Sequence, residues 1–199
     1  MLEIIYSGDL MLWDGTLYPA VLVVIGLWAL VYFGTQRLTL RRARLLRPSA
    51  WDAHIPEWEW PAFVYVLAYP YPLVLFAVNL ADAAAIKVIT AFVILVLFSG
   101  LLFLLFPTAI PRTREPRSLL LRLIYRLDSG GNCIPSLHGA SAFLTTCLLY
   151  YVKAPHAWLG ILCTLAISGA ALSIRQHYLR DILAGYLLGL MVFFIVVLL

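Results

Sequence analysis

The chain has 199 residues, of which 63% are hydrophobic and 12% are charged, with a formal net charge of +4 and a mean hydropathy of +0.94. Soluble domains usually carry about 25% charged residues, so this composition excludes an ordinary soluble domain and indicates a membrane protein. We predict the lipid bilayer as a partner and no nucleic-acid partner.

Six stretches lack Asp, Glu, Lys and Arg. A bilayer core requires about 20 apolar residues per helix. We therefore predict an all-α integral membrane bundle of six transmembrane helices that forms a single domain over residues 1–199. Pro70 and Pro72 are expected to kink the second helix. The six stretches are residues 15–36, 60–81, 88–111, 129–152, 154–174 and 182–199.

Basic residues are concentrated in three connections between these stretches. The segments 35–59, 107–134 and 174–181 lie on one side of the membrane in this topology, and they contain 12 of the 14 Lys and Arg residues. The positive-inside rule places that side in the cytoplasm. The arginines from Arg37 to Arg47 are expected to bind anionic lipid head groups rather than to take part in chemistry.

The third apolar stretch ends in a proline-rich segment, Pro107-Thr108-Ala109-Ile110-Pro111-Arg112-Thr113-Arg114. Its prolines stop the helix and hold Arg112 and Arg114 just outside the hydrocarbon. Planar guanidinium groups suit bidentate contacts with phosphate oxygens, and the alternative is that both arginines only fix the topology. Residues 119–127 then alternate apolar stretches with arginines, which predicts a short helix in the membrane interface.

The fourth stretch contains Pro135-Ser136-Leu137-His138. Pro135 suits the first position of a helix, and Ser136 offers a hydroxyl where free backbone N–H groups form a natural anion site. His138 lies one turn later and could donate a proton to a departing oxygen. A single histidine in a span is more often a packed polar residue, but a second histidine occurs on the same side of the membrane.

That second histidine lies in Ser173-Ile174-Arg175-Gln176-His177-Tyr178-Leu179-Arg180-Asp181. If the helix begins at His177, the i, i+4 spacing allows the Asp181 carboxylate to accept the Nδ1–H of the imidazole. Nε2 of His177 is then free to attack a phosphorus atom, beside Arg175 as a fixed cation for the oxygens.

Cysteine spacing gives no sign of a disulfide or of a metal site. The spacing of Cys133, Cys147 and Cys163 matches no disulfide or metal-binding pattern, so we predict neither a disulfide nor a metal site. We expect no cofactor.

The histidine segments resemble two signature motifs of one family. Pro135-Ser136-Leu137-His138 and His177-Tyr178-Leu179-Arg180-Asp181 are similar to the second and third motifs of the type 2 phosphatidic acid phosphatase superfamily. Pro107-Thr108-Ala109-Ile110-Pro111-Arg112 and Gln176-His177-Tyr178 resemble the branch that contains inositol phosphorylceramide synthase. The resemblance covers about residues 88–190, which we take as the catalytic core.

The resemblance implies a metal-independent reaction through a phosphohistidine. In it His177 is the nucleophile, Asp181 orients His177, and His138 protonates the leaving group and later activates water or an acceptor hydroxyl. Ser136, Arg112 and Arg175 would hold the phosphoryl oxygens, with Arg114 as a further candidate.

Two basic residues of the family pattern are replaced in this chain, and Leu137 stands where many of the phosphatases have glycine. Leu105 stands seven residues before Arg112, where the family has a lysine, and Ala171 stands six residues before His177, where it has an arginine. Three functions follow as hypotheses: a lipid phosphatase acting on a lipid phosphate or polyprenyl (di)phosphate, a phosphotransferase that moves a phosphorylated head group between lipids, and a non-catalytic membrane binding protein that retains the site.

Overall fold

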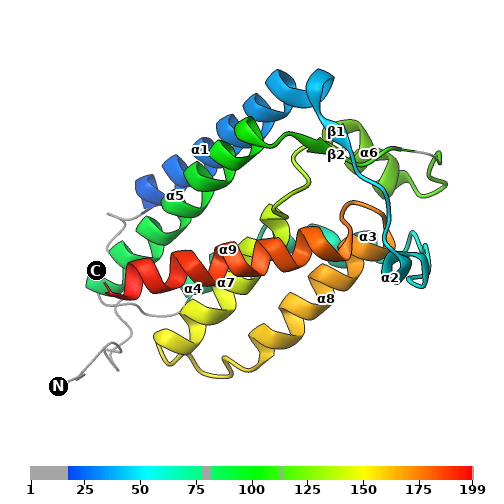
Figure 1. Cartoon of the computed structure of the whole chain (residues 1–199). Coiled ribbons are helices and arrows are strands. Elements are labelled where there is room, and N and C mark those ends of the chain that lie inside the picture. The colour runs from blue at the N-terminus through cyan, green and yellow to red at the C-terminus, as the bar shows by residue number, and fades with distance from the viewer. Residues whose placement is uncertain (1–17, 78–81, 113, 199) are drawn as a thin grey trace.

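The computed structural model describes residues 18–77, 82–112 and 114–198, and it is mostly helical (Figure 1). The ends of the first, second and sixth apolar stretches fall outside these residues. Five long helices form: α1 (Tyr18–Thr39), α5 (Asp82–Leu105), α7 (Leu137–Tyr151), α8 (Leu159–Ser173) and α9 (Leu179–Leu198).

Three of these helices are long and apolar enough to cross a membrane, which makes the chain a candidate multi-pass membrane protein. The candidate spans are Pro19–Arg42, Ala83–Leu105 and Leu179–Leu198. Helices α7 and α8 have 15 residues each. At 1.5 Å per residue such a helix is about 22 Å long, which is shorter than the roughly 30 Å of a hydrocarbon core.

The second apolar stretch is broken rather than kinked. It forms α3 (Ala62–Tyr65), η2 (Val66–Ala68), η3 (Tyr71–Leu73) and α4 (Val74–Ala77). The break falls at Pro70 and Pro72, because a proline in a helix interior removes a hydrogen bond and clashes with the preceding turn. The prediction of one continuous, kinked second helix is therefore wrong in the described part of this stretch.

Short elements join the helices at one end of the molecule. They are η1 (Leu40–Arg42), β1 (Arg44–Leu45), α2 (Ala50–Ala53), β2 (Thr108–Ala109) and α6 (Leu119–Leu127). The helix expected at 119–127 is confirmed with the same bounds, and the Ser118 hydroxyl accepts the N–H of Leu121 at its start.

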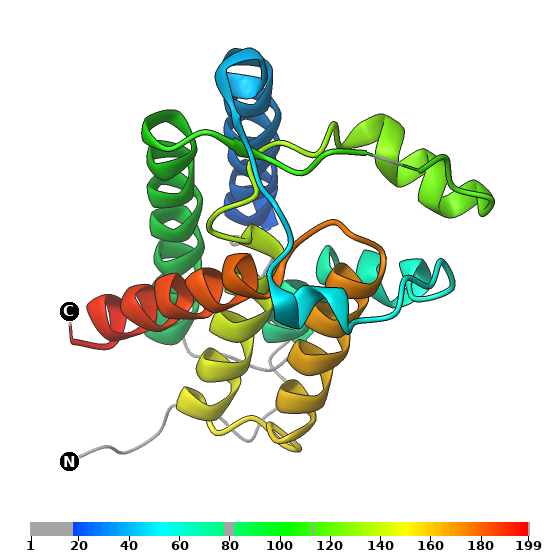
Figure 2. The same ribbon diagram turned by 45° about the vertical axis from the view of Figure 1, so that its right-hand side comes forward.

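The three basic connections meet at this same end. β1 pairs in parallel with β2, with Arg44 opposite Thr108. Nη2 of Arg180 donates to the carbonyl oxygen of Arg47 at 2.8 Å. Figures 1 and 2 show α1 and α5 running side by side toward the β pair, while α7, α8 and α9 form a second group. The connections therefore lie together, as the predicted topology requires.

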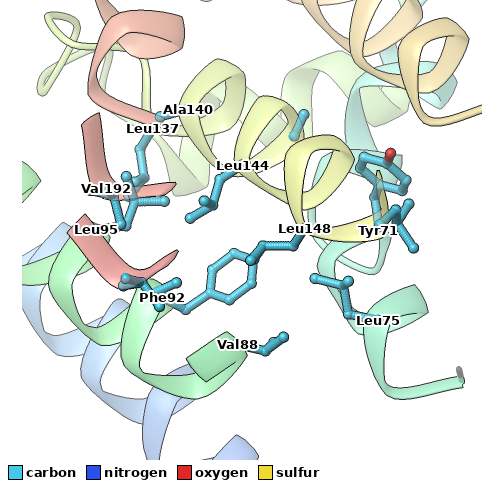
Figure 3. Packing of buried hydrophobic residues seen from close by; sticks show 14 of the residues in the cluster. Tyr71, Leu75, Val88, Phe92, Leu95, Leu137, Ala140, Leu144, Leu148 and Val192 are labelled. Carbon is cyan, nitrogen blue, oxygen red and sulfur yellow. The ribbon is translucent and has the colours of Figure 1, made fainter. Parts of the chain in front are cut away.

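The main core fills the space between α5, α7, α9 and the broken segment. Figure 3 shows Phe92 and Leu95 of α5, Leu144 of α7 and Val192 of α9 in this cluster, all of them buried. Burial of these side chains fixes how the helix that begins near His138 packs on the helix that carries Asp181.

Candidate active site

The two histidines singled out in the sequence lie in contact. Nδ1 of His138 is 3.4 Å from Nε2 of His177, and the exposed fractions of these residues are 6% and 3%. His138 belongs to the first turn of α7, whereas His177 lies in the loop before α9. Thirty-nine residues separate them in sequence, so the packing of α7 and α9 creates the pair.

Glycines allow α7 and α9 to approach each other closely. A Cβ atom at Gly185 would collide with the carbonyl oxygen of Ser136, and one at Gly189 would lie 2.8 Å from the carbonyl oxygen of Ala140. In addition, the N–H of Ser136 donates to the carbonyl oxygen of Asp181 at 2.9 Å. The start of α7 is thereby fixed directly against the start of α9.

Asp181 is placed behind His177, but it does not hydrogen-bond to it. Its Oδ2 atom lies 3.8 Å from Nδ1 of His177 and accepts the N–H of Tyr178 at 2.8 Å. The helix starts at Leu179, two residues after His177, so the condition for a hydrogen bond from His177 to Asp181 is not met, and Asp181 instead accepts a backbone N–H at the helix start. Among the described residues, Nδ1 of His177 and Oδ1 of Asp181 have no hydrogen-bond partner.

Two tyrosines that sequence reasoning missed surround His138. The hydroxyl of Tyr65 lies 3.0 Å from Nε2 of His138, and that of Tyr69 lies 3.3 Å from the same atom. Both come from the broken second segment. The available signal was a pair of tyrosines four residues apart beside the prolines, in a stretch that looked like an ordinary span.

Ser136 is the N-cap residue of α7, which begins at Leu137, so the expected first helical position at Pro135 is wrong by two residues. The Ser136 hydroxyl accepts the N–H of Gly139 at 3.2 Å, and the residue is fully buried. A helix start is therefore present one turn from the histidine pair. That start supplies the local positive potential of free backbone N–H groups.

Arg112 is joined to the histidine loop. It donates from Nη1 to the carbonyl oxygen of Arg175 at 3.0 Å and from Nη2 to Oε1 of Gln176 at 2.8 Å, and it stacks on the ring of Tyr125. Its Nε atom and Nε2 of Gln176 are buried without a hydrogen-bond partner among the described residues. Buried donors of this kind favour an anion.

Asp128 was also missed. Its carboxylate accepts hydrogen bonds from the hydroxyl of Tyr32 at 2.7 Å and from Nε2 of Gln36 at 2.9 Å, and it lies 4.0 Å from Nη2 of Arg112. These contacts attach α1 to the site. The ring of Tyr32 in turn packs edge-on against His138.

Arg175 and Arg114 have other partners. The guanidinium of Arg175 donates to Oε1 of Glu57 and to the carbonyl oxygens of Asp52 and Ile55, each at 2.9 Å. Arg114 is half-exposed, with Nη2 3.7 Å from Oε1 of Glu59. The structure therefore gives neither side chain a contact with the histidine pair, although both line a small pocket with Arg112.

Asp52 fixes the start of α9 from a distant segment. It is 1% exposed, and its Oδ1 atom accepts the N–H of Leu179 at 2.8 Å while Oδ2 accepts hydrogen bonds from Ser49. Burial alone would raise the pKa of this carboxyl. The hydrogen bonds from Ser49 and Leu179 outweigh burial, so the pKa is lowered from its usual 3.8.

In the part of the chain that the structure describes, no three His, Cys, Asp or Glu side chains are grouped so as to hold a metal ion. Comparison with protein-family models, with known proteins and with solved structures finds no match to this chain.

Proposed function

We propose that the chain is a membrane phosphatase that hydrolyses a lipid phosphate or polyprenyl (di)phosphate through a phosphohistidine. The observation that carries the proposal is the line of Asp181, His177 and His138. Oδ2 of Asp181 lies 3.8 Å from Nδ1 of His177, and Nε2 of His177 lies 3.4 Å from Nδ1 of His138. The motif resemblance assigns the same three residues.

The reaction has two steps. First, Nε2 of His177 bonds to phosphorus while the bond from phosphorus to the lipid oxygen breaks, and protonated His138 gives its proton to that oxygen. Water then attacks phosphorus while neutral His138 takes a proton from it. The N–P bond breaks, inorganic phosphate leaves, and both histidines return to their starting states. Asp181 favours the positively charged imidazole of His177.

Arg112 is the strongest candidate for holding the phosphoryl oxygens. Its Nε atom is buried without a hydrogen-bond partner among the described residues, and so is Nε2 of Gln176, the neighbour of His177 to which Arg112 is hydrogen-bonded. Preorganised donors stabilise the charge that develops in phosphoryl transfer. Ser136 adds the start of α7. That Arg175 and Arg114 also bind the phosphoryl oxygens stays a prediction.

A second candidate is transfer of the phosphoryl-bearing group to a lipid hydroxyl. Burial of both histidines favours it, because excluding water protects a reactive intermediate until an acceptor arrives. We place the site at the cytoplasmic membrane surface of a six-span protein, on the basis of the Lys and Arg distribution.

The test is phosphate release from a panel of lipid phosphates and diphosphates in detergent with a chelator present. His177→Asn should abolish release, and His156→Asn, at an exposed histidine, is the matched control. Formation of a new phosphorylated lipid from an added lipid alcohol, without release of inorganic phosphate, would identify the transferase. A well-folded wild type that is inactive with every donor and acceptor would instead support a non-catalytic binding protein.

A further inference from the structure

An apolar cavity of about 390 Å³ ends at His138. It lies between α1, α5, the first turn of α7 and the broken second segment. Among its lining residues only Tyr69, His138 and Ser141 are polar. These three are in contact, since the Tyr69 hydroxyl is 3.3 Å from Nε2 of His138 and the Ser141 hydroxyl donates to the His138 carbonyl oxygen at 3.2 Å. The cavity therefore has one polar end and apolar walls elsewhere.

The cavity extends along α1 and α5. α1 lines it from Val21 to Trp28, and α5 lines it from Ile89 to Val96. Seven positions correspond to about 10 Å along a helix axis. The ring of Trp28 meets that of Tyr69 with centroids 5.7 Å apart, so Trp28 lies at the polar end and Val21 lies at the far end.

The cavity opens sideways, between α1 and residues 69–73. Ile25, Tyr69 and Leu73 are 44%, 45% and 41% exposed, whereas Phe92 and Leu95 on the opposite wall are buried (Figure 3). Leu22, next to this opening on α1, is also exposed, and α1 is a candidate membrane span. An opening on such a surface faces the hydrocarbon of a bilayer.

We infer that this cavity binds one linear hydrocarbon chain of a phosphorylated lipid, which enters from the bilayer between α1 and residues 69–73. The inference rests on the proposed function, because the phosphate of that lipid would lie at His138 and His177. Apolar walls that extend about 10 Å from one polar end suit a chain of methylenes attached to a phosphate. Because the bilayer interior is as apolar as the cavity, each further methylene should raise affinity only through its contacts with the cavity walls, until the cavity is filled.

The first experiment is photo-crosslinking in detergent with two alkyl phosphates, one with a diazirine at the chain terminus and one with a diazirine beside the phosphate. We expect the terminal probe to label the far end, at Val21, Val24 or Ile89, and the proximal probe to label Leu137 or Ser141. Identical or scattered labelling, for example on exposed Leu162 of α8 and Leu187 of α9, would overturn the inference.

The second experiment fills the cavity. Val24 lines it, whereas Val23 is 67% exposed on the other face of the same turn. Val24→Trp should lower labelling by the terminal probe at least ten-fold, and Val23→Trp should leave it unchanged. Val24→Phe, with a smaller effect, replaces Val24→Trp if the latter does not fold. Equal labelling of both variants and wild type would contradict a chain inside the cavity.

The outcomes separate this inference from the proposed function. Labelling needs no turnover, so localised labelling without phosphate release would refute hydrolysis and retain the chain site. Phosphate release with scattered labelling would refute the chain site alone. An alkyl alcohol with the same terminal diazirine is the control for head-group recognition. If it labels as strongly as the phosphate, the occupant is any membrane lipid and not the phosphorylated substrate.

Discussion

The carboxylate of Asp52 accepts the backbone N–H of Leu179 at 2.8 Å, across 127 residues of sequence. Leu179 is the first residue of α9, so a side chain from the connection after α1 caps the helix that carries Asp181. The same carboxylate is held by the Ser49 hydroxyl and N–H in a capping box of α2. One buried charge therefore joins two helix starts beside His177.

Asp52→Asn is expected to lower the free energy of unfolding by about 1–3 kcal/mol, because the amide cannot accept hydrogen bonds at every place where the carboxylate does. Thermal unfolding in detergent measures the change. Ser49→Ala is the control, since it removes the contact on α2 and keeps the one to Leu179. An equal loss in both variants would show that the bond to Leu179 contributes little.

The contribution of Asp52 should depend on pH. Its pKa is lower in the folded protein than its usual 3.8, so its contribution is complete above that value and is lost as pH falls through the folded pKa. The stability difference between wild type and Asp52→Asn should therefore be constant near neutral pH and shrink below about pH 3.8. A difference that grows with acidity would contradict this assignment.

Tyr65→Phe tests the contact at His138. Loss of a hydroxyl 3.0 Å from Nε2 should slow phosphoryl transfer about ten-fold and move the pH-rate limb that reports His138. Tyr71→Phe is the matched control, because that hydroxyl bonds to Thr146 and to the Gly160 carbonyl oxygen, away from the pair. The same rate loss in both variants would indicate a purely structural effect.

Gly185→Ala should destabilise the protein by about 1–3 kcal/mol, because the added methyl group collides with Ser136 on α7. Gly169→Ala on α8 is the matched control. Nothing lies within 4 Å of its added Cβ, so the higher helix propensity of alanine should raise stability slightly. Denaturant unfolding of both variants distinguishes the steric effect from the propensity effect.

Arg112→Ala and Arg175→Ala should differ in what they impair. Arg112 donates to Gln176 in the loop that carries His177, and its buried Nε atom has no partner among the described residues. Loss of Arg112 should therefore slow phosphoryl transfer by about 100-fold. Arg175 donates hydrogen bonds to the Glu57 carboxylate and to the carbonyl oxygen of Asp52. Its loss should therefore mainly lower the midpoint of thermal unfolding. A large rate loss in a fully stable Arg175→Ala protein would instead support the phosphate role that the motif suggests.

The sequence predicted well where local rules decide. The helix at 119–127 formed as expected, and a helix start lies near Ser136, although α7 begins at Leu137 rather than at Pro135. The meeting of His138 with His177 was anticipated only because both lie on one side of the predicted membrane. Their distance depends on Gly185 and Gly189, whose role is visible only when α7 and α9 are packed.

The site residues that the sequence did not predict were missed for a common physical reason. Tyr65 lies in a segment whose apolar composition predicts a span, and its contact with His138, 73 residues away in sequence, arises only when the helices pack. Asp52 and Asp128 are acidic residues in connections, where carboxylates are usually solvated. Their burial arises from contacts with residues far away in sequence, which no local pattern encodes.

The contact between the two histidine rings affects how a substrate can be used. An attacking nitrogen lies about 3 Å from phosphorus, and an acid lies about 3 Å from the leaving oxygen, so a phosphoryl group between them needs more than the present 3.4 Å. Binding must push the rings apart, and the required free energy has to come from a remote part of the substrate. On the proposed function, contacts between a long chain and the cavity walls supply it, and a soluble phosphate ester lacks these contacts. Preference for lipids is therefore expected in the turnover number as well as in affinity.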